Sequence, residues 1–139
     1  MQRHNALANA LERVGDRWSL LVVEALLAGP RRFGDLQEAL QGVATNVLSQ
    51  RLRHLQSERL VVANLYQSAP PRYVYQLTEH GKGLAGPLRL IEHWGAEQAE
   101  PATAPLAHAA CGGLLEPRWY CSSCGEVVGD EFESQLFYV

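Results

Sequence analysis

Four residues near the C-terminal end of the 139-residue chain have the types and spacing of a zinc site. Two residues separate His108 from Cys111, two separate Cys121 from Cys124, and nine lie between the pairs. Thiolates and imidazoles are the ligands that Zn²⁺ takes in tetrahedral structural sites. Because protein would fill all four positions, we expect one structural zinc ion per chain and no open position for catalysis.

The same cysteines also allow a redox interpretation. A Cys-x-x-Cys pair can form a reversible disulfide, so Cys121 and Cys124 are compatible with a thiol redox switch or a thiol enzyme. Cys111 would then be a free thiol and His108 a bystander. We favour the metal because two similar pairs, each followed directly by a glycine, are harder to obtain by chance than one.

A second set of residues has the character of a DNA-binding surface. Leu48, Leu52 and Leu55 recur at helical spacing and predict a helix that begins at Thr45 and has one apolar face. Its opposite face carries polar and cationic side chains, which suit base edges and phosphates. The candidate DNA-binding residues on and around this helix are Arg31, Arg32, Thr45, Asn46, Ser49, Gln50, Arg51, Arg53 and Arg72.

The elements before this helix follow from the spacing of apolar residues. A first helix is expected to end at Gly15, and Asp16 can cap a second helix over residues 17–28. A brief helix over residues 34–40 and a turn over residues 41–43 come next. A polar helix face alone is equally compatible with a solvated surface. A short helix, a turn and a second helix with a polar outer face, however, make up a helix-turn-helix.

The elements after this helix are a hairpin and a closing helix. Residues 60–65 and 72–77 are rich in β-branched and aromatic residues and predict two strands joined by a loop over residues 66–71. Such a hairpin corresponds to a wing, from which Arg72 can reach a minor groove or its phosphates. Thr78 can cap the closing helix, which its glycines and proline are expected to weaken or kink.

Charge divides the chain into two parts. Residues 1–97 hold eleven Lys and Arg against nine Asp and Glu, whereas residues 98–139 hold one against six. An Ala- and Pro-rich linker is expected over residues 98–107, and a separate module over residues 108–139. No apolar run approaches the roughly 20 residues that cross a bilayer, and no secretory signal is evident. We therefore expect a cytoplasmic protein with no membrane partner.

Four ordered segments resemble signatures of the HxlR family of winged helix-turn-helix regulators. They are VGDRWSLL at 14–21, GPRRFGDL at 29–36, VLSQRLRHL at 47–55 and PRYVYQLTEHG at 71–81. The resemblance covers residues 5–95 and implies a homodimeric transcriptional regulator whose patterned helix enters the major groove. It also implies that the first and last helices form much of the dimer interface. The expected interface residues are Leu7, Leu11, Leu84, Leu88, Ile91 and Trp94.

Two positions bear on how such a regulator would be controlled. Many members of the HxlR family carry a cysteine just before the first helix, and Asn5 stands at that position here, so thiol sensing there is excluded. Trp18 and Trp94 could line a pocket for a small-molecule effector, but aromatic residues at helical spacing more often belong to the core, and we favour the core.

The sequence thus predicts a mainly α-helical winged helix-turn-helix domain over residues 1–97 with a small β-hairpin wing. A linker and a small zinc-ribbon-like β module follow. We expect a homodimer that binds double-stranded DNA sequence-specifically, acts as a repressor and has no enzymatic activity. The alternatives are the redox role described above and a winged helix that binds protein instead of DNA.

Overall fold

The computed structural model describes residues 3–101 and 106–128. The chain divides into two units, residues 1–88 and residues 89–139. No helix within the described residues is both long enough and apolar enough to cross a membrane.

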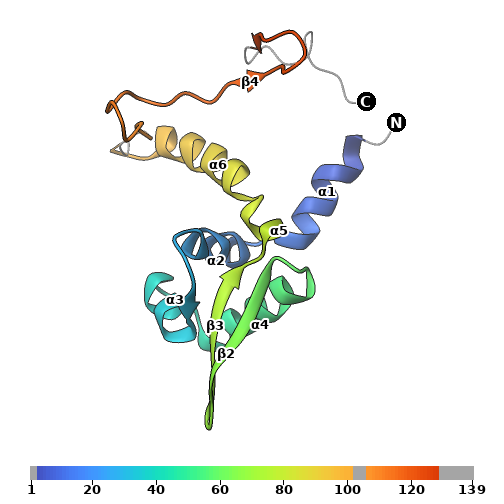
Figure 1. The fold of residues 1–139 in the computed structure, drawn as a ribbon, viewed down its shortest axis with the longest axis vertical. Helices are drawn as coiled ribbons and strands as arrows, with labels where there is room; N and C mark the ends of the chain where they lie inside the picture. The colour runs from blue at the N-terminus through green and yellow to red at the C-terminus, as the bar shows by residue number, and fades with distance from the viewer. Residues whose placement is uncertain (1–2, 102–105, 129–139) are drawn as a thin grey trace. The chain divides into compact units, whose positions relative to one another are not determined.

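The first unit is a winged helix-turn-helix with a three-stranded antiparallel sheet in the order β1-β3-β2 (Figure 1). Its elements in chain order are α1 (Arg3–Val14), α2 (Arg17–Leu27), β1 (Arg31–Arg32), α3 (Phe33–Ala39), α4 (Thr45–Ser57), β2 (Val61–Ser68), β3 (Pro71–Leu77) and α5 (Glu79–Lys82). Helix α6 (Ala85–Gln98) follows and crosses the boundary between the units, and the second unit contains the short strands β4 (Trp119–Tyr120) and β5 (Val127–Val128).

The beginning of α2 confirms the predicted cap. Asp16 has an extended backbone, and its carboxylate accepts a hydrogen bond from the backbone N–H of Ser19 at 2.9 Å. An N-cap carboxylate satisfies one of the free amides of the first turn and suits the positive end of the helix dipole. The direction of α2 is thereby set at its first residue.

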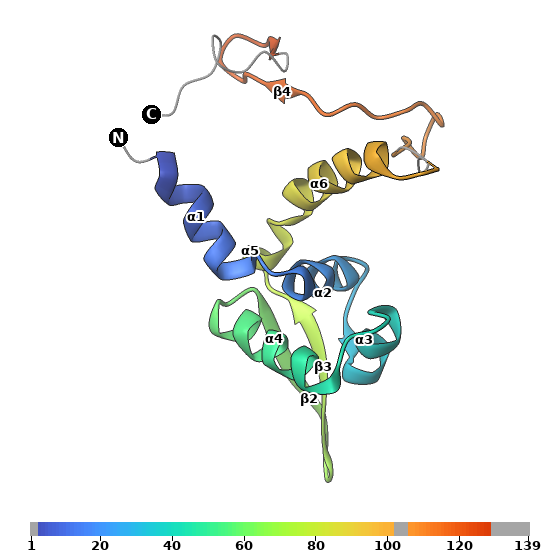
Figure 2. The same ribbon diagram turned by 180° about the vertical axis from the view of Figure 1, so that it is seen from behind.

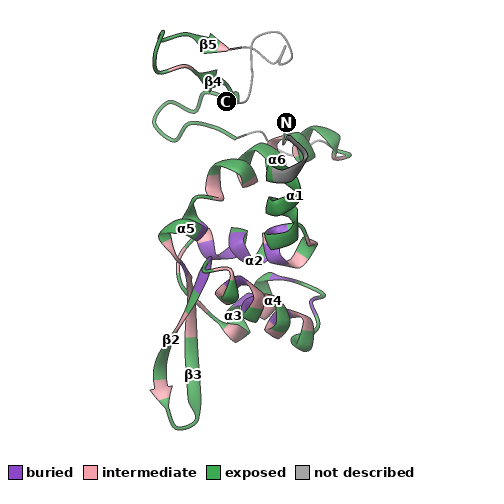
Figure 3. Cartoon of the chain, turned by 90° about the vertical axis from the view of Figure 1, so that its right-hand side faces the viewer, coloured by how far each residue is buried: buried purple, intermediate pink, exposed green. Residues whose placement is uncertain are grey.

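The core of the first unit lies beneath α4. Leu48, Leu52 and Leu55 are at most 1% exposed and contribute to one apolar cluster with Val22 of α2 and Leu36 of α3. Burying a leucine side chain of this kind is worth about 1.5 to 3 kcal/mol. Figure 3 shows the buried residues concentrated where α2, α4 and the base of the sheet meet. Rotating α4 would expose these leucines, so its polar face is held outward.

The wing is longer than the sequence predicted. The expected loop over residues 66–71 is wrong, because β2 runs to Ser68 and β3 begins at Pro71. Leu65 pairs with Tyr73 and Gln67 pairs with Arg72, so the extra residue between Leu65 and Gln67 forms a β-bulge. A bulge accommodates an unpaired residue and bends the strand. The distal part of the hairpin extends past α3 and α4 in both Figure 1 and Figure 2.

The predicted closing helix is two helices. Thr78 caps the first of them as expected, since its hydroxyl accepts the N–H of Gly81 at 3.0 Å. Gly81 is buried against the backbone of Leu60, where an added Cβ would lie 2.1 Å from the carbonyl oxygen. Helix α5 ends at Gly83, and the chain restarts as α6, with Pro87 in its first turn, where a missing N–H costs little.

Polar contacts connect the C-terminal end of α1 to the C-terminal end of α4. Arg13 forms an ion pair with Glu58 and also donates to the Glu58 backbone carbonyl at 3.2 Å. The Nε2 atom of His54 lies 2.7 Å from the Arg13 carbonyl oxygen. These contacts join residues of two helices that are 41 and 45 positions apart in the chain.

Candidate nucleic-acid interface

The outer face of α4 presents polar side chains to solvent. Asn46, Gln50 and Arg53 are exposed, and Ser49 is half-buried. Arg53 Nε donates to the Ser49 carbonyl oxygen at 3.3 Å, one turn earlier in the helix. The side chains of Asn46 and Gln50 make no hydrogen bond to other described residues. The face therefore offers amide and guanidinium groups of the kind that hydrogen-bond base edges in a major groove.

Thr45 joins the two helices of the helix-turn-helix. Its hydroxyl accepts a hydrogen bond from Gln37 Nε2 of α3 at 2.7 Å. Thr45 is the first residue of α4, so this bond fixes the start of that helix against α3. Within the interface Thr45 has a positioning role.

Arg51 forms an ion pair within the domain. Its Nη1 atom lies 3.3 Å from Asp16 Oδ2, which ties α4 to the beginning of α2. Burial alone would raise the pKa of Asp16, but hydrogen bonding from Ser19 and the bond and charge of Arg51 together hold this pKa below its ordinary value. The predicted phosphate contact of Arg51 therefore competes with an internal carboxylate.

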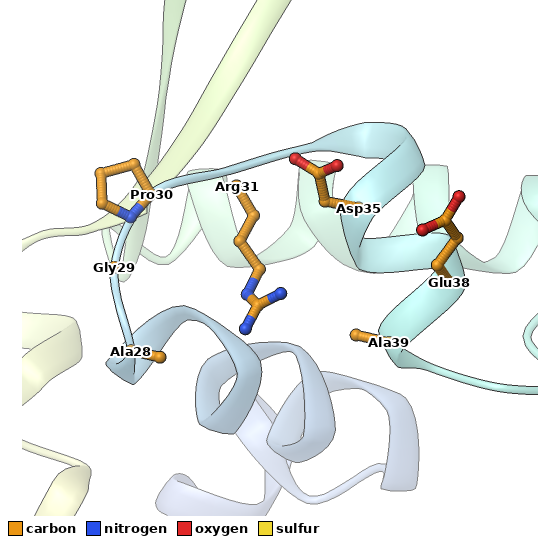
Figure 4. Close-up of a pocket in the computed structure, with 7 residues that line it drawn as sticks. All are labelled: Ala28, Gly29, Pro30, Arg31, Asp35, Glu38 and Ala39. Carbon is orange, nitrogen blue, oxygen red and sulfur yellow. The ribbon is translucent and has the colours of Figure 1, made fainter.

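Arg31 also has an internal partner. Its Nε donates to the Ala25 carbonyl oxygen at 2.9 Å, in the last turn of α2, where a cation suits the negative end of the helix dipole. Figure 4 shows the side chain extending toward α2 inside an open pocket of about 540 Å³. Asp35 and Glu38 of α3 line the same pocket, and their carboxylates oppose the approach of a phosphate.

Arg32 and Arg72 lie together in a groove between the wing and α3. The groove has a volume of about 390 Å³, and Tyr66, Tyr73 and the acidic Asp35 are among the residues that line it. The Arg32 guanidinium lies 4.9 Å from the centre of the Tyr66 ring, within the range of a cation–π contact. Arg72 is exposed on the wing and makes no side-chain hydrogen bond to any described residue. Its charge is thus available to a partner molecule.

Tyr66 is a residue of this surface that the sequence analysis missed. It occupies the bulge of β2, which turns its ring toward Arg32. The alternation of residues in a regular strand predicts which face each side chain takes, but a bulge shifts that pattern by one residue. The available signal was limited to an aromatic residue directly after the predicted strand over residues 60–65.

The four predicted metal ligands are brought together in the structure only as two pairs. His108 Nδ1 lies 3.4 Å from Cys111 Sγ. In the second pair, the backbone N–H groups of Cys124 and Ser123, and then the Cys124 thiol, lower the pKa of Cys121 by hydrogen bonding. Among residues 3–101 and 106–128, no group of three or more His, Cys, Asp and Glu side chains converges on one point.

The residues predicted for the dimer interface fall into two groups. Leu84 and Leu88 pack against the core of the first unit. The remaining four are exposed, with exposed fractions of 68% for Leu7, 54% for Leu11, 55% for Ile91 and 65% for Trp94.

The two tryptophans with a predicted core role differ. Trp18 packs partly against the core, as predicted, and Arg17 lies 4.7 Å from the centre of its ring. Trp94 is mostly exposed, so its predicted core role is wrong. It lies on the exposed side of α6, a helix that has no buried residue in the structure.

Comparisons with known proteins agree with this architecture. The model of the HxlR-like helix-turn-helix family matches residues 13–103. An uncharacterized HTH-type transcriptional regulator of Mycobacterium tuberculosis is 38% identical over 126 residues, which covers 88% of this chain and 79% of that protein. The HTH-type transcriptional regulator YodB of Bacillus subtilis is 27% identical over 95 residues, or 68% of this chain and 85% of that protein.

Solved structures show the same fold. The reduced form of Bacillus subtilis YodB superposes with a TM-score of 0.60 at 26% identity and covers 71% of this chain and 97% of that chain. A regulator assigned to the MarR family, from Enterococcus faecalis V583, gives a TM-score of 0.62 at 32% identity and covers 73% of this chain and 92% of that chain.

Proposed function

The chain belongs to the HxlR-like helix-turn-helix family, and we propose that it is a homodimeric repressor that occupies double-stranded DNA through α4 and the wing. Its relatives are named HTH-type transcriptional regulators, which supports a role in transcription through DNA binding. Such a regulator acts in the compartment that holds the DNA, which in a bacterium is the cytoplasm.

The observation that carries this proposal is the outward polar face of α4. Its leucine face is completely buried, so Asn46, Gln50 and Arg53 are held on the surface by the core of the domain. Asparagine and glutamine amides suit adenine, and arginine suits guanine, in the pattern of donors and acceptors that the major groove presents. The order of α3, α4 and the wing around this helix favours DNA binding over a merely solvated face.

The cations of the wing supply the contacts that do not depend on sequence. Since Arg31 and Arg51 have internal partners, Arg32 and Arg72 are the cations beside the wing with the best access to phosphates, and the exposed Arg53 lies on α4. The aromatic ring of Tyr66 holds the Arg32 guanidinium beside the wing. Phosphate contacts of this kind set the position of a domain on the duplex, and the helix then distinguishes bases.

The homodimer accounts for the exposed apolar residues. Leu7 and Leu11 on α1, and Ile91 and Trp94 on α6, are all at least half exposed. Clusters of large exposed apolar side chains in a regular helix commonly mark an interface. Two copies of the domain would place two recognition helices on two half-sites, which raises both affinity and specificity. A small-molecule effector could change the distance between them.

A binding experiment tests the function directly. A DNA duplex is selected from a random library by the full-length protein, and its affinity is measured for the wild type, Arg53→Ala and the control Arg89→Ala, which removes an exposed arginine of α6. We expect Arg53→Ala to weaken the selected duplex by about 1 to 3 kcal/mol and to leave dimerisation unchanged. Failure to select any sequence, with binding that does not depend on salt, would favour a protein-binding winged helix instead.

A further inference from the structure

Two turns in the second unit share one backbone hydrogen-bond pattern. In the first turn, the N–H of His108 donates to the Gly113 carbonyl at 2.8 Å, and the N–H of Gly112 donates to the His108 carbonyl at 2.7 Å. In the second turn, the N–H of Cys121 donates to the Glu126 carbonyl at 2.9 Å, and the N–H of Gly125 donates to the Cys121 carbonyl at 2.8 Å. The same two bonds therefore close both turns.

The flanking residues extend this equivalence. Ala107 pairs with Leu114 across the first turn, and Tyr120 pairs with Val127 across the second, at the same offset from the turn in each case. The fifth residue of each turn is a glycine with a positive φ, +71° for Gly112 and +75° for Gly125. Residues other than glycine rarely adopt a positive φ, which explains why a glycine follows each of the two ligand pairs.

The equivalence places a metal-binding side chain at the first and fourth positions of both turns. His108 corresponds to Cys121, and Cys111 corresponds to Cys124. The separation of 3.4 Å between His108 Nδ1 and Cys111 Sγ fits a shared metal ion. Zinc bonds of about 2.3 Å to sulfur and about 2.0 Å to nitrogen, at a tetrahedral angle, put the two ligand atoms roughly 3.5 Å apart.

A backbone amide supports the sulfur of the first turn. The N–H of Gly113 points at Cys111 Sγ at 3.4 Å. Amide hydrogen bonds of this kind stabilise a metal-bound thiolate and orient it. The first turn thus has its ligand pair and a supporting donor in place.

Within residues 106–128, the described segment that carries the two turns, no buried apolar side chain holds the turns in place. Among residues 106–128 none is buried, Cys121 and Val128 are half-buried, and the others are exposed. Leu114, Trp119, Tyr120 and Val127 are all more than half exposed. Since residues 106–128 bury no side chain of their own, a crosslink or a metal ion is the kind of contact that stabilises so short a segment.

We propose that the two turns are the halves of one structural zinc site, with His108, Cys111, Cys121 and Cys124 as its four ligands. Binding of the ion draws the two turns together and stabilises the segment that carries them, as metal binding does in other small metal-binding domains. This proposal is independent of the DNA-binding role, which rests on residues of the first unit.

The redox alternative does not account for the first turn. A reversible disulfide between Cys121 and Cys124 would require only the second turn, and the matching geometry around His108 and Cys111 would then have no purpose. The match to the Mycobacterium tuberculosis regulator covers 88% of the chain and therefore must include part of the residues beyond the linker. The unit is thus shared, at least in part, with a relative.

Metal content and cobalt spectroscopy of the full-length protein test the proposal. We expect one zinc ion per chain in protein purified under reducing conditions, and a tetrahedral cobalt spectrum with sulfur-to-cobalt charge transfer after exchange with Co²⁺. Cys111→Ser and Cys124→Ser should each weaken metal binding at least about tenfold, whereas Ser122→Ala, a residue of the second turn with no ligand role, should leave it unchanged.

A conservative variant keeps the test decisive if ligand variants fail to fold. His108→Cys should retain metal and intensify the charge-transfer band, because a fourth thiolate replaces the imidazole. Wild-type protein that neither contains zinc nor binds added Zn²⁺ or Co²⁺ would overturn the proposal. Isolation of metal-free protein with a Cys121–Cys124 disulfide would overturn it in favour of a redox pair. Loss of metal with operator affinity retained would leave the DNA-binding function intact.

Discussion

Replacing Arg72 with alanine is the sharpest test of how the wing contacts DNA. Arg72 is exposed near the end of the hairpin, pairs in the strand register with Gln67 and has no internal hydrogen-bond partner among the described residues. Its guanidinium should therefore meet the phosphate backbone or a narrow minor groove. We expect Arg72→Ala to weaken binding to many sequences alike.

The size of the effect follows from counterion release. Each phosphate contact contributes about 0.9 to the slope of log affinity against log salt, so the loss of one contact in each protomer of a dimer lowers the slope by about 1.8. From 50 to 200 mM salt, roughly a fourfold change in concentration, the wild type should lose about twelve times more affinity than Arg72→Ala.

Fluorescence anisotropy over this salt range measures the slope, with the selected operator and with a duplex of unrelated sequence. Arg89→Ala is the matched control, since it removes an exposed arginine outside the helix-turn-helix and the wing. Arg31→Ala is a second control, because Arg31 is bound to the Ala25 carbonyl and should contribute little to the slope. An unchanged slope in Arg72→Ala would refute the phosphate contact, and a loss confined to one base pair would assign Arg72 to base recognition.

Two further outcomes follow from contacts described above. Ile91→Glu places a charge on the exposed apolar side of α6 and should shift the dimer toward monomer or aggregate in sedimentation equilibrium. The control Glu92→Gln should leave the dimer unchanged. A stable Ile91→Glu dimer would place the interface elsewhere. Asp16→Ala should lower the free energy of unfolding by about 0.5 to 2 kcal/mol at neutral pH through loss of the cap. The pKa of Asp16 is lowered in the folded state, so its ionised carboxylate contributes fully to stability above the unfolded pKa of about 3.9, and this contribution is lost as the pH falls through the folded pKa. The difference in unfolding free energy between wild type and Asp16→Ala should therefore narrow in acid. A difference that does not depend on pH would contradict this assignment.

Features set by neighbours in the chain could be predicted from the sequence. The leucine spacing of α4 predicted both its buried face and its polar face, and Asp16 and Thr78 were correctly predicted as caps. These signals act within one or two helical turns. Residues that share a helix face or a capping box keep that relation in almost any fold.

Features set by distant contacts could not be predicted in this way. Arg51 is a typical phosphate-binding residue by sequence, but its carboxylate partner Asp16 lies 35 residues away. The bulge that brings Tyr66 to Arg32 depends on strand pairing, which the composition of β2 does not encode. The glycines and proline of the closing helix did indicate a weak point, but the close approach of Gly81 to Leu60 is a tertiary contact that sequence spacing does not reveal.

The contacts between the ends of α1 and α4 have a mechanical consequence. Arg13, His54 and Glu58 fasten the two helices at one point, so α1 and the recognition helix tilt together. In the proposed dimer α1 also contacts the other protomer. The angle at which the two protomers meet along α1 would then set the distance between the two recognition helices. A signal that tilts α1 by a few degrees would then change the distance between the two α4 helices, so that they no longer match the 34 to 36 Å repeat of the major groove.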